Sequence, residues 1–192
     1  RVGFGMDLDG ETLAIGGPDY NGKGTGAGAV WMVERNGGKW DKLQLLQPAQ
    51  LNADSWFGYY GSVALDGNRV AVGAMKFNGV ANNSGAVWVF EKGTTWTEKQ
   101  FIKPPDGPSN FPDSNGQSVA LEGDVLVIGA PGYGYASNNW NRGAIHIYER
   151  ESGTFKAKAL FKWPGQHTLN MQFGGTLAMN DGLIAVGCSG CQ

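Results

Sequence analysis

The chain has 192 residues, and its 15 lysines and arginines nearly balance its 17 aspartates and glutamates. This balance leaves no basic stripe that could neutralise a run of phosphates, so nucleic acid is not an expected partner. No apolar stretch reaches the roughly 18–20 residues that span a bilayer, so no membrane insertion is expected in this segment. The 32 glycines and 8 prolines fall at regular intervals between apolar runs, which is typical of a turn-rich all-β domain.

One segment occurs four times in register, and each copy ends in a glycine after an apolar run. The copies span residues 8–16, 65–73, 121–129 and 179–187. Their closing glycines are 57, 56 and 58 residues apart. Two further markers have the same period, a Gly-Ala-Val or Gly-Ala-Ile tripeptide and, after it, an aromatic residue. They lie at Gly28, Gly85 and Gly143, and at Trp40, Trp96 and Phe155. A period near 50 is in the range of propeller blades and solenoid units.

Each copy contains four strand signals. In the second copy they cover residues 62–65, 69–73, 85–91 and 95–102. The first two are joined by Asp66-Gly67-Asn68, whose residues tolerate the positive φ of a tight hairpin. The third is apolar on both faces, so we expect other layers to cover the sheet on both sides. Four antiparallel strands per unit fit a propeller, in which each blade lies between its neighbours, better than a solenoid.

We therefore predict an all-β chain, a β-propeller segment of about 3.3 four-stranded antiparallel blades with a period of about 57 residues. The blades are expected at approximately 1–56, 57–113 and 114–172, with 173–192 starting a fourth. Their strands are expected within 5–46, 62–102, 117–162 and 175–187. Equivalent residues of the third strands should be buried between sheets. They are Trp31, Trp88 and His146, and Val30, Val87 and Ile145.

Several motifs of the second copy resemble the FG-GAP repeat. They are Gly61-Ser62-Val63-Ala64-Leu65-Asp66-Gly67, Val70-Ala71-Val72-Gly73-Ala74, Ser84-Gly85-Ala86-Val87-Trp88-Val89-Phe90-Glu91 and Trp96. The Phe-Gly half is best kept at 173–178, and the Gly-Ala-Pro half at 129–131. Such repeats form the propeller of integrin α-subunits and of bacterial and algal cell-surface proteins. The resemblance implies a closed seven-bladed ring and a location outside the cell or on its surface.

The chain holds fewer than half of the blades of such a ring. It begins without a Met or a signal peptide, and both ends stop inside copies of the repeat. We therefore expect a longer polypeptide. The expected partners include the remaining blades, from the same chain or from a neighbouring one, because a partial ring would expose the apolar faces of its end blades.

Calcium is the cofactor that the resemblance suggests. Integrin-type repeats often carry an acidic loop between the first two strands, where oxygen ligands hold the ion. The corresponding turns at 66–68 and 122–124 are too short to surround an ion, so this site does not carry over. Asp19 and Asn21 form a weaker candidate, against which stands ordinary turn chemistry. No other cofactor is expected.

The connections between second and third strands vary most, at 18–26, 75–84 and 131–142. Radially arranged blades place equivalent loops on one rim, so we expect a recognition surface there. Exposed aromatics beside amides suit a protein or sugar partner. The expected anchors are Tyr20, Phe77, Tyr135 and Trp140, with the amides Asn78, Asn138 and Asn139. The alternative is that the amides satisfy turns and the aromatics pack beneath the loops.

Two shorter motifs remain. Asn82-Asn83-Ser84 is a candidate glycosylation site, meaningful for a secreted eukaryotic chain. Cys188 and Cys191 form a Cys-x-x-Cys pattern without the helix that a redox motif needs and without the second ligand pair that zinc needs. A structural disulfide, between the two or to other residues, is the preferred interpretation, and it suits an oxidising compartment.

The sequence offers little for catalysis, and we expect no enzyme activity. It has two histidines: His146 replaces a packing tryptophan, and His167 has no evident nucleophile partner. Asp9, Asp66 and Glu122 occupy repeated turn positions, which indicates turn chemistry. The first functional hypothesis is a non-catalytic extracellular scaffold or adhesion module of a cell-surface, matrix or filament protein. The alternatives are a lectin-like propeller and an accessory domain of a larger secreted enzyme.

Overall fold

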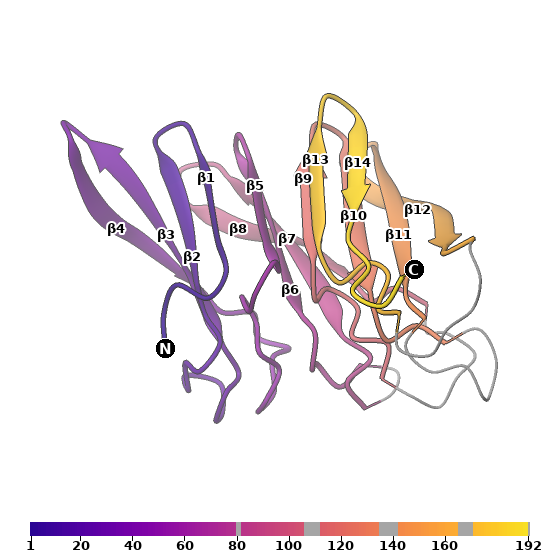
Figure 1. Ribbon diagram of the computed structural model, residues 1–192. Coiled ribbons are helices and arrows are strands. Elements are labelled where there is room, and N and C mark those ends of the chain that lie inside the picture. The colour runs from indigo at the N-terminus through magenta and orange to yellow at the C-terminus, as the bar shows by residue number, and fades with distance from the viewer. Residues whose placement is uncertain (80–81, 106–111, 135–141, 165–170, 192) are drawn as a thin grey trace.

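The structure, a computed structural model, describes residues 1–79, 82–105, 112–134, 142–164 and 171–191. Over these residues it contains strands and connecting segments and no helix. Figure 1 shows the three four-stranded sheets side by side in chain order, with the β13–β14 hairpin in front of the third. The prediction of an all-β chain of four-stranded antiparallel sheets is confirmed, while the closed ring of seven blades stays an expectation.

Three four-stranded sheets and one hairpin make up the described chain, and we call them blades 1 to 4. Blade 1 contains β1 (Met6–Asp9), β2 (Thr12–Gly17), β3 (Ala29–Asn36) and β4 (Lys39–Leu46). Blade 2 contains β5 (Val63–Asp66), β6 (Arg69–Ala74), β7 (Ala86–Lys92) and β8 (Trp96–Ile102). Blade 3 contains β9 (Val119–Glu122), β10 (Val125–Ala130), β11 (Ala144–Glu151) and β12 (Thr154–Lys162). Blade 4 is the hairpin of β13 (Leu177–Asn180) and β14 (Leu183–Val186).

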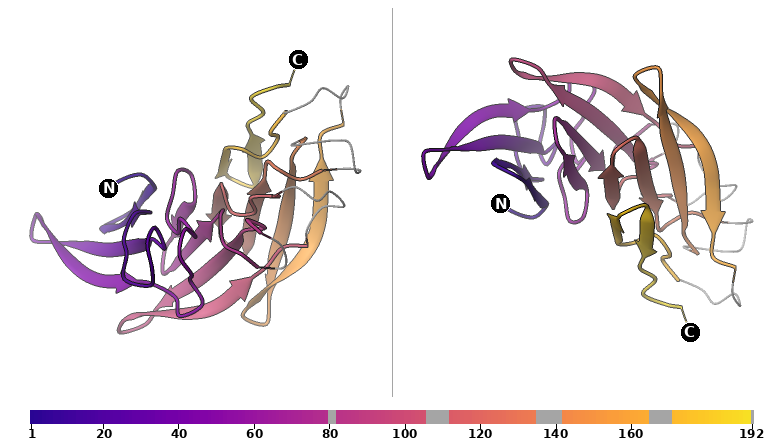
Figure 2. Two further views of the ribbon diagram at one scale, coloured as in Figure 1. Left: turned by 90° about the horizontal axis from the view of Figure 1, so that it is seen from below. Right: turned by 90° about the horizontal axis from the view of Figure 1, so that it is seen from above.

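The blades fan about a common axis in the two views of Figure 2. The first strands β1, β5, β9 and β13 are in contact with one another, blade to blade, and lie on the inner side of the fan. They line a cavity of about 340 Å³. The fourth strands form the outer edges, and each third–fourth strand pair contains a β-bulge. Such bulges bend an edge strand and limit its pairing with other chains.

The hairpins between first and second strands close with two-residue turns, as Asp66 pairs with Arg69 around Gly67-Asn68. Gly67 has φ +57°, which is the conformation that an Asp-Gly turn supplies at low cost. At the other end of β6, the closing Gly73 lies against the connector that leads to blade 3. A Cβ atom there would overlap the carbonyl oxygen of Gly116, so this repeated glycine permits neighbouring blades to approach closely.

The core consists of layers between successive blades. Ala14, Val30 and Met32 of blade 1 pack against Val72 and Trp88 of blade 2. A second layer joins blades 2 and 3, and a third joins blade 3 to the hairpin of blade 4. Burial of both faces of blade 2 explains why its third strand is apolar from Ala86 to Phe90.

The packing prediction holds for five of its six residues. Trp31, Trp88 and His146 occupy equivalent places, because each lies in a third strand opposite the same position of the second strand. Trp88 is fully buried, as are Val30 and Val87, and His146 and Ile145 are nearly so. Trp31 is only half-buried, which corrects the prediction. Its side chain lies on the face of blade 1 that points away from blade 2, where no other described blade covers it.

Candidate functional site: the loop rim

The loops between second and third strands leave the lower edge of the blades in Figure 1, and the tight hairpin turns lie at the upper edge. The segments that connect one blade to the next run along the same lower edge. We call these loops and connectors the loop rim. Its described part is 18–28, 47–62, 75–79, 82–85, 103–105, 112–118, 131–134, 142–143, 163–164 and 171–176.

Each loop is bonded to the connector that enters the next blade. Isolated parallel bridges join Gly28 to Phe57, Gly85 to Asn115 and Gly143 to Phe173. The backbone amide of Phe57 donates to the carbonyl of Ala27 at 3.1 Å, and equivalent bonds recur at the next two junctions. The rim is therefore held by backbone hydrogen bonds at every junction, and side chains on it start from fixed positions.

The predicted anchors differ in their exposure. Tyr20 is 38% exposed and packs edge-on against Trp31, with 5.5 Å between the ring centroids. Phe77 is only 6% exposed, because its ring packs edge-on against both Trp88 and Phe101, at 5.3 and 5.6 Å between centroids. The expectation that Phe77 is an exposed anchor is wrong, and the alternative of packing beneath the loop applies to it. Four predicted residues lie outside the described part of the chain. They are Tyr135, Asn138, Asn139 and Trp140.

The amides of the second loop act within it. The Asn78 side chain is exposed, and its Oδ1 accepts a hydrogen bond from the backbone amide of Asn83 at 2.8 Å. Asn82 is exposed in the following turn, whereas Ser84, the third residue of the sequon, is 3% exposed. The Ser84 Oγ accepts a bond from the amide of Gly79 at 3.2 Å. Glycosylation of Asn82 stays a prediction.

The calcium candidates already have protein partners. Asp19 Oδ2 accepts a hydrogen bond from Arg1 Nε at 2.6 Å. Asn21 Oδ1 accepts one from the amide of Gly26 at 2.9 Å, which is the turn chemistry that we set against calcium. Within the described residues, no group of three or more His, Cys, Asp or Glu side chains could hold a metal ion.

A cluster of aromatic side chains, formed by the rim and the N-terminal segment, escaped the sequence analysis. Phe4, Trp56, Tyr59 and Tyr60 form it, and we call it the aromatic cluster. Ring centroids lie 5.6 Å apart for Phe4–Tyr59, 4.7 Å for Phe4–Tyr60, 4.7 Å for Tyr59–Tyr60 and 4.9 Å for Trp56–Tyr59. Tyr60 is 56% exposed and the other three are partly exposed.

A longer connector in blade 2 builds this cluster. In blades 2, 3 and 4 the closing glycine bonds to a glycine and to a Ser or Thr of the connector. These two partners are separated by one residue in blades 3 and 4 and by three in blade 2. The intervening residue is Gln117 in blade 3 and Gly175 in blade 4, whereas blade 2 has Tyr59, Tyr60 and Gly61. Comparing the repeats in this way could have found the cluster from the sequence.

Trp56 is also unusual in its backbone. It has φ +58°, and the equivalent residues Ser114 and Gln172 have φ +55° and +53°. A bulky residue in this left-handed region carries strain that the surrounding structure must offset. The Lys76 ammonium lies 3.2 Å from the centroid of the Trp56 ring, and the Arg1 guanidinium lies 5.4 Å from that of Phe4. The cluster thus combines aromatic faces with two cations.

The repeat architecture decides which family this chain represents. The family model for the FG-GAP repeat matches residues 40–90 and 96–148, which is more than half of the chain. The chain belongs to the FG-GAP repeat family. A comparison with curated proteins finds no match. Among the described residues, no helix is long and apolar enough to cross a membrane.

At the upper edge of the FG-GAP blades, side-chain hydrogen bonds join neighbouring blades. Asp9 Oδ2 accepts from the amide of Gly67 at 2.6 Å, and Asp66 Oδ2 accepts from that of Gly123 at 2.9 Å. Glu122 accepts from the turn amides of blade 4. These acids therefore do more than the turn chemistry that the sequence indicated: each binds the hairpin turn of the next blade.

Two further positions of the repeat join blades in the same direction. Gln44 Nε2 donates to the carbonyl of Trp96 at 2.7 Å, while its Oε1 accepts from the Trp96 amide at 2.7 Å. Gln100 binds the backbone of Phe155 in the same way, at 2.8 and 2.7 Å. Ion pairs join Glu34 to Lys92 and Glu91 to Arg150. These side chains therefore hold neighbouring blades together.

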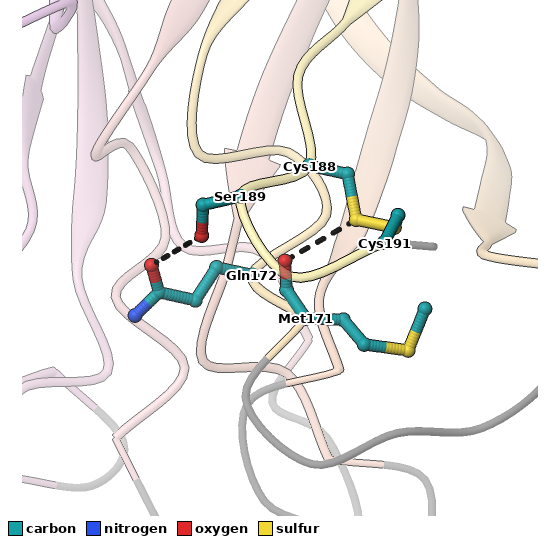
Figure 3. The surroundings of a disulfide bond; sticks show 5 residues. All are labelled: Met171, Gln172, Cys188, Ser189 and Cys191. Carbon is teal, nitrogen blue, oxygen red and sulfur yellow. Dashed lines mark hydrogen bonds between the residues drawn. A yellow bond between two sulfur atoms is a disulfide. The ribbon is translucent and has the colours of Figure 1, made fainter.

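Blade 4 carries the disulfide, which joins Cys188 to Cys191 with 5.5 Å between their Cα atoms (Figure 3). Counted from the closing glycine, these are the positions of the alanine and the aromatic residue of one turn in blades 2 and 3. The pairs are Ala74 with Phe77, and Ala130 with Tyr133. There the aromatic amide donates to the alanine carbonyl at 3.0 Å. In blade 4 a covalent bond spans the same turn.

The disulfide loop also holds the incoming connector of blade 4. The Cys188 Sγ lies 3.2 Å from the carbonyl oxygen of Met171, to which the amide of Gly190 donates at 3.0 Å. Ser189 Oγ donates to Gln172 Oε1 at 3.0 Å (Figure 3). No helix precedes or follows the pair in the described residues.

Reduction of this disulfide should destabilise the chain by about 2 kcal/mol, the loss expected for a short cross-linked loop. The double variant Cys188→Ala/Cys191→Phe writes the turn of blade 2 into blade 4 and should be insensitive to reductant. Denaturant unfolding with and without a phosphine reductant measures the change in stability of the wild type and of the double variant. Cys188→Ser/Cys191→Ser, which lacks bond and aromatic ring alike, should match the reduced protein. Equal stability of the oxidised and reduced wild type would contradict the assignment.

Proposed function

We propose that this FG-GAP chain is a non-catalytic interaction module of an extracellular or cell-surface protein and that it binds a protein partner through its loop rim. The observation that carries the proposal is the aromatic cluster. Tyrosine, tryptophan and arginine are the residues that most often dominate binding energy at protein interfaces. Here Trp56, Tyr59 and Tyr60 are gathered with Arg1 on one partly exposed surface.

The contrast between the two edges supports the choice of surface. At the upper edge, acids and glutamines bind the next blade, so their groups are engaged within the propeller. At the rim, backbone bonds hold each loop to its connector. Side chains such as Tyr20 and Tyr60 remain accessible on a rigid frame. That combination is typical of recognition loops on a fixed scaffold.

Two features support a place outside the cell. The disulfide of blade 4 is of the structural kind that persists in oxidising compartments. The family resemblance adds the cell surface and adhesion, and a surface protein that presents many copies would gain strength from weak single contacts. The non-catalytic role is supported by His146, which is buried in the core, where a substrate has no access.

Further blades are the second class of partner that we propose. The half-buried face around Trp31 is apolar and is equivalent to the faces of blades 2 and 3 that receive a preceding blade. Arg35 occupies the position in blade 1 that Lys92 occupies in blade 2. Lys92 forms an ion pair with Glu34 of the preceding blade. A preceding blade with a glutamate at the position of Glu34 and a glutamine at the position of Gln44 would fit this face.

Photo-crosslinking at the rim tests the proposed function. Tyr60 is replaced by benzoylphenylalanine in the full-length protein on source cells, and Trp40, 45% exposed at the upper edge, is replaced in a matched control. We expect crosslinks from position 60 to one extracellular protein, at least tenfold above those from position 40. Added as a soluble competitor, the wild-type chain should suppress these crosslinks. The double variant Trp56→Ser/Tyr60→Ser, in which Ser at 56 copies Ser114 of blade 3, should fail to suppress them.

Four outcomes would overturn the proposal. Crosslinks from position 40 alone would place the partner at the upper edge. Crosslinks from position 60 to intracellular proteins would contradict the location. Binding of the purified chain to a glycan array, with no protein crosslinked at position 60, would favour the lectin-like alternative. An associated catalytic domain as the crosslinked partner would favour the accessory-domain alternative.

A further inference from the structure

The junction between blades 2 and 3 differs chemically from the one before it. Between blades 1 and 2, Phe57 and Trp88 form an edge-to-face aromatic pair with 5.5 Å between the ring centroids. At the same positions of the repeat, blade 3 has Asn115 and His146. Both members of one aromatic pair are thus replaced by polar residues, at one junction of the repeat.

Both polar side chains are buried. Asn115 is fully buried and His146 is 4% exposed. Asn115 Nδ2 donates to the carbonyl of Ser84 at 2.8 Å, but among the described residues Asn115 Oδ1 and His146 Nε2 have no hydrogen-bond partner. Burying an imidazole nitrogen without a partner costs free energy even in the neutral ring, and the charged ring costs far more.

No described group offsets a positive charge on His146. The face of blade 2 opposite it is apolar, with Ala71, Val87 and Val89. On its own blade the Tyr133 ring lies 5.9 Å away. The titratable and charged groups around Tyr133 are Asp113, Arg142 in the same loop, and Lys162, whose ammonium lies 5.3 Å from the Tyr133 ring. Burial and, after it, the Asp113 carboxylate raise the pKa of Tyr133. Within the described residues none of these forms an ion pair with His146.

We infer that the packing of blade 3 on blade 2 is an acid-sensitive joint, which protonation of His146 loosens. The imidazole fits the closed junction only while it is neutral. Opening the junction exposes it to water, where it can accept a proton. Acid therefore favours every state in which blade 3 has separated from blade 2, whereas the aromatic junction between blades 1 and 2 does not respond.

The direction and the pH window follow from the histidine alone. Burial lowers the pKa of His146 from 6.5 to about 4. Above pH 6.5 the ring is neutral in both states, so the junction has its full stability. Below 6.5 the open state binds a proton that the closed state does not, and the closed-to-open ratio falls up to tenfold per pH unit. At pH 4 the loss reaches about 160-fold.

Two measurements on the full chain test this inference. The first is an NMR titration of the imidazole nitrogens of the wild type, which needs no variant. His146 should remain neutral at pH 5, while His167 reports on the chain's other histidine. Titration of His146 near 6.5 with the protein still folded would overturn the inference, because the closed junction would then accept the charge.

The second measurement compares denaturant unfolding at pH 7 and pH 4.5 in matched variants. Asn115→Phe/His146→Trp installs the pair of the preceding junction and should lose the part of the acid destabilisation that His146 causes. His167→Gln is the control and should keep the wild-type response. Equal responses of the wild type and the double variant would overturn the inference. Should the double variant not fold, His146→Phe alone provides the comparison.

Discussion

Replacing Trp88 by alanine should lower the free energy of unfolding by about 3–5 kcal/mol, the range for large aromatic residues removed from cores. Trp88 is fully buried between blades 1 and 2. Its ring stacks on Phe101 at 4.6 Å and meets Phe57 and Phe77 edge-on at 5.5 and 5.3 Å. Alanine leaves a cavity in this layer that the β-sheets on either side can close only in part. Urea unfolding followed by circular dichroism measures the change.

The control for this prediction is Trp40→Ala. Trp40 is 45% exposed at the start of β4, so its removal exposes little and should change the unfolding free energy by less than about 1 kcal/mol. Similar losses for the two variants would mean that the layer between blades 1 and 2 does not carry the stability that its burial indicates.

The variant Gly85→Ala should cost about 2–5 kcal/mol. Gly85 has φ +78°, and a Cβ atom there would overlap the backbone of Asn115 in the connector to blade 3. The cost combines about 1–2 kcal/mol for an L-residue in the left-handed region with about 1–3 kcal/mol for the steric overlap. The bridge between Gly85 and Asn115 should also weaken, which amide hydrogen exchange of the loop rim can follow.

Gly67→Ala separates the two contributions. Gly67 has φ +57°, but a Cβ atom there would meet nothing within 4 Å. This variant should therefore show the conformational cost alone, about 1–2 kcal/mol. If Gly85→Ala were no more harmful than Gly67→Ala, close approach of loop and connector would not be the reason for the repeated glycine.

The same geometry explains why the junctions can differ while the blades stay alike. Backbone bridges and close glycine contacts set the distance between neighbouring blades at each junction. The side chains between them then vary, from the aromatic pair Phe57 and Trp88 to Asn115 and His146. Position 159 continues this variation, because Ala159 stands where Gln44 and Gln100 bind the next blade.

Much of the fold is local and could be read from the sequence. Asp66-Gly67 turns, period-two strands and the tripeptides at Gly28, Gly85 and Gly143 each act within one blade, and their recurrence specifies the blade. Burial of Trp88 and His146 followed from the apolar third strands. The disulfide partners were open in the sequence and are adjacent in the structure, because Cys188 and Cys191 span one turn.

Other features depend on residues far apart in the chain. Whether Phe77 is an exposed anchor depends on the rings of Trp88 and Phe101, which pack around it from the neighbouring strands. The aromatic cluster brings Phe4 to Tyr59, and Asp66 finds the amide of Gly123. A local pattern cannot specify such pairs, since contact between blades depends on how whole sheets stack. The sequence alone therefore determined the repeat, its strands and its turns, and only the tertiary structure decided which side chains face a neighbouring blade and which face a partner.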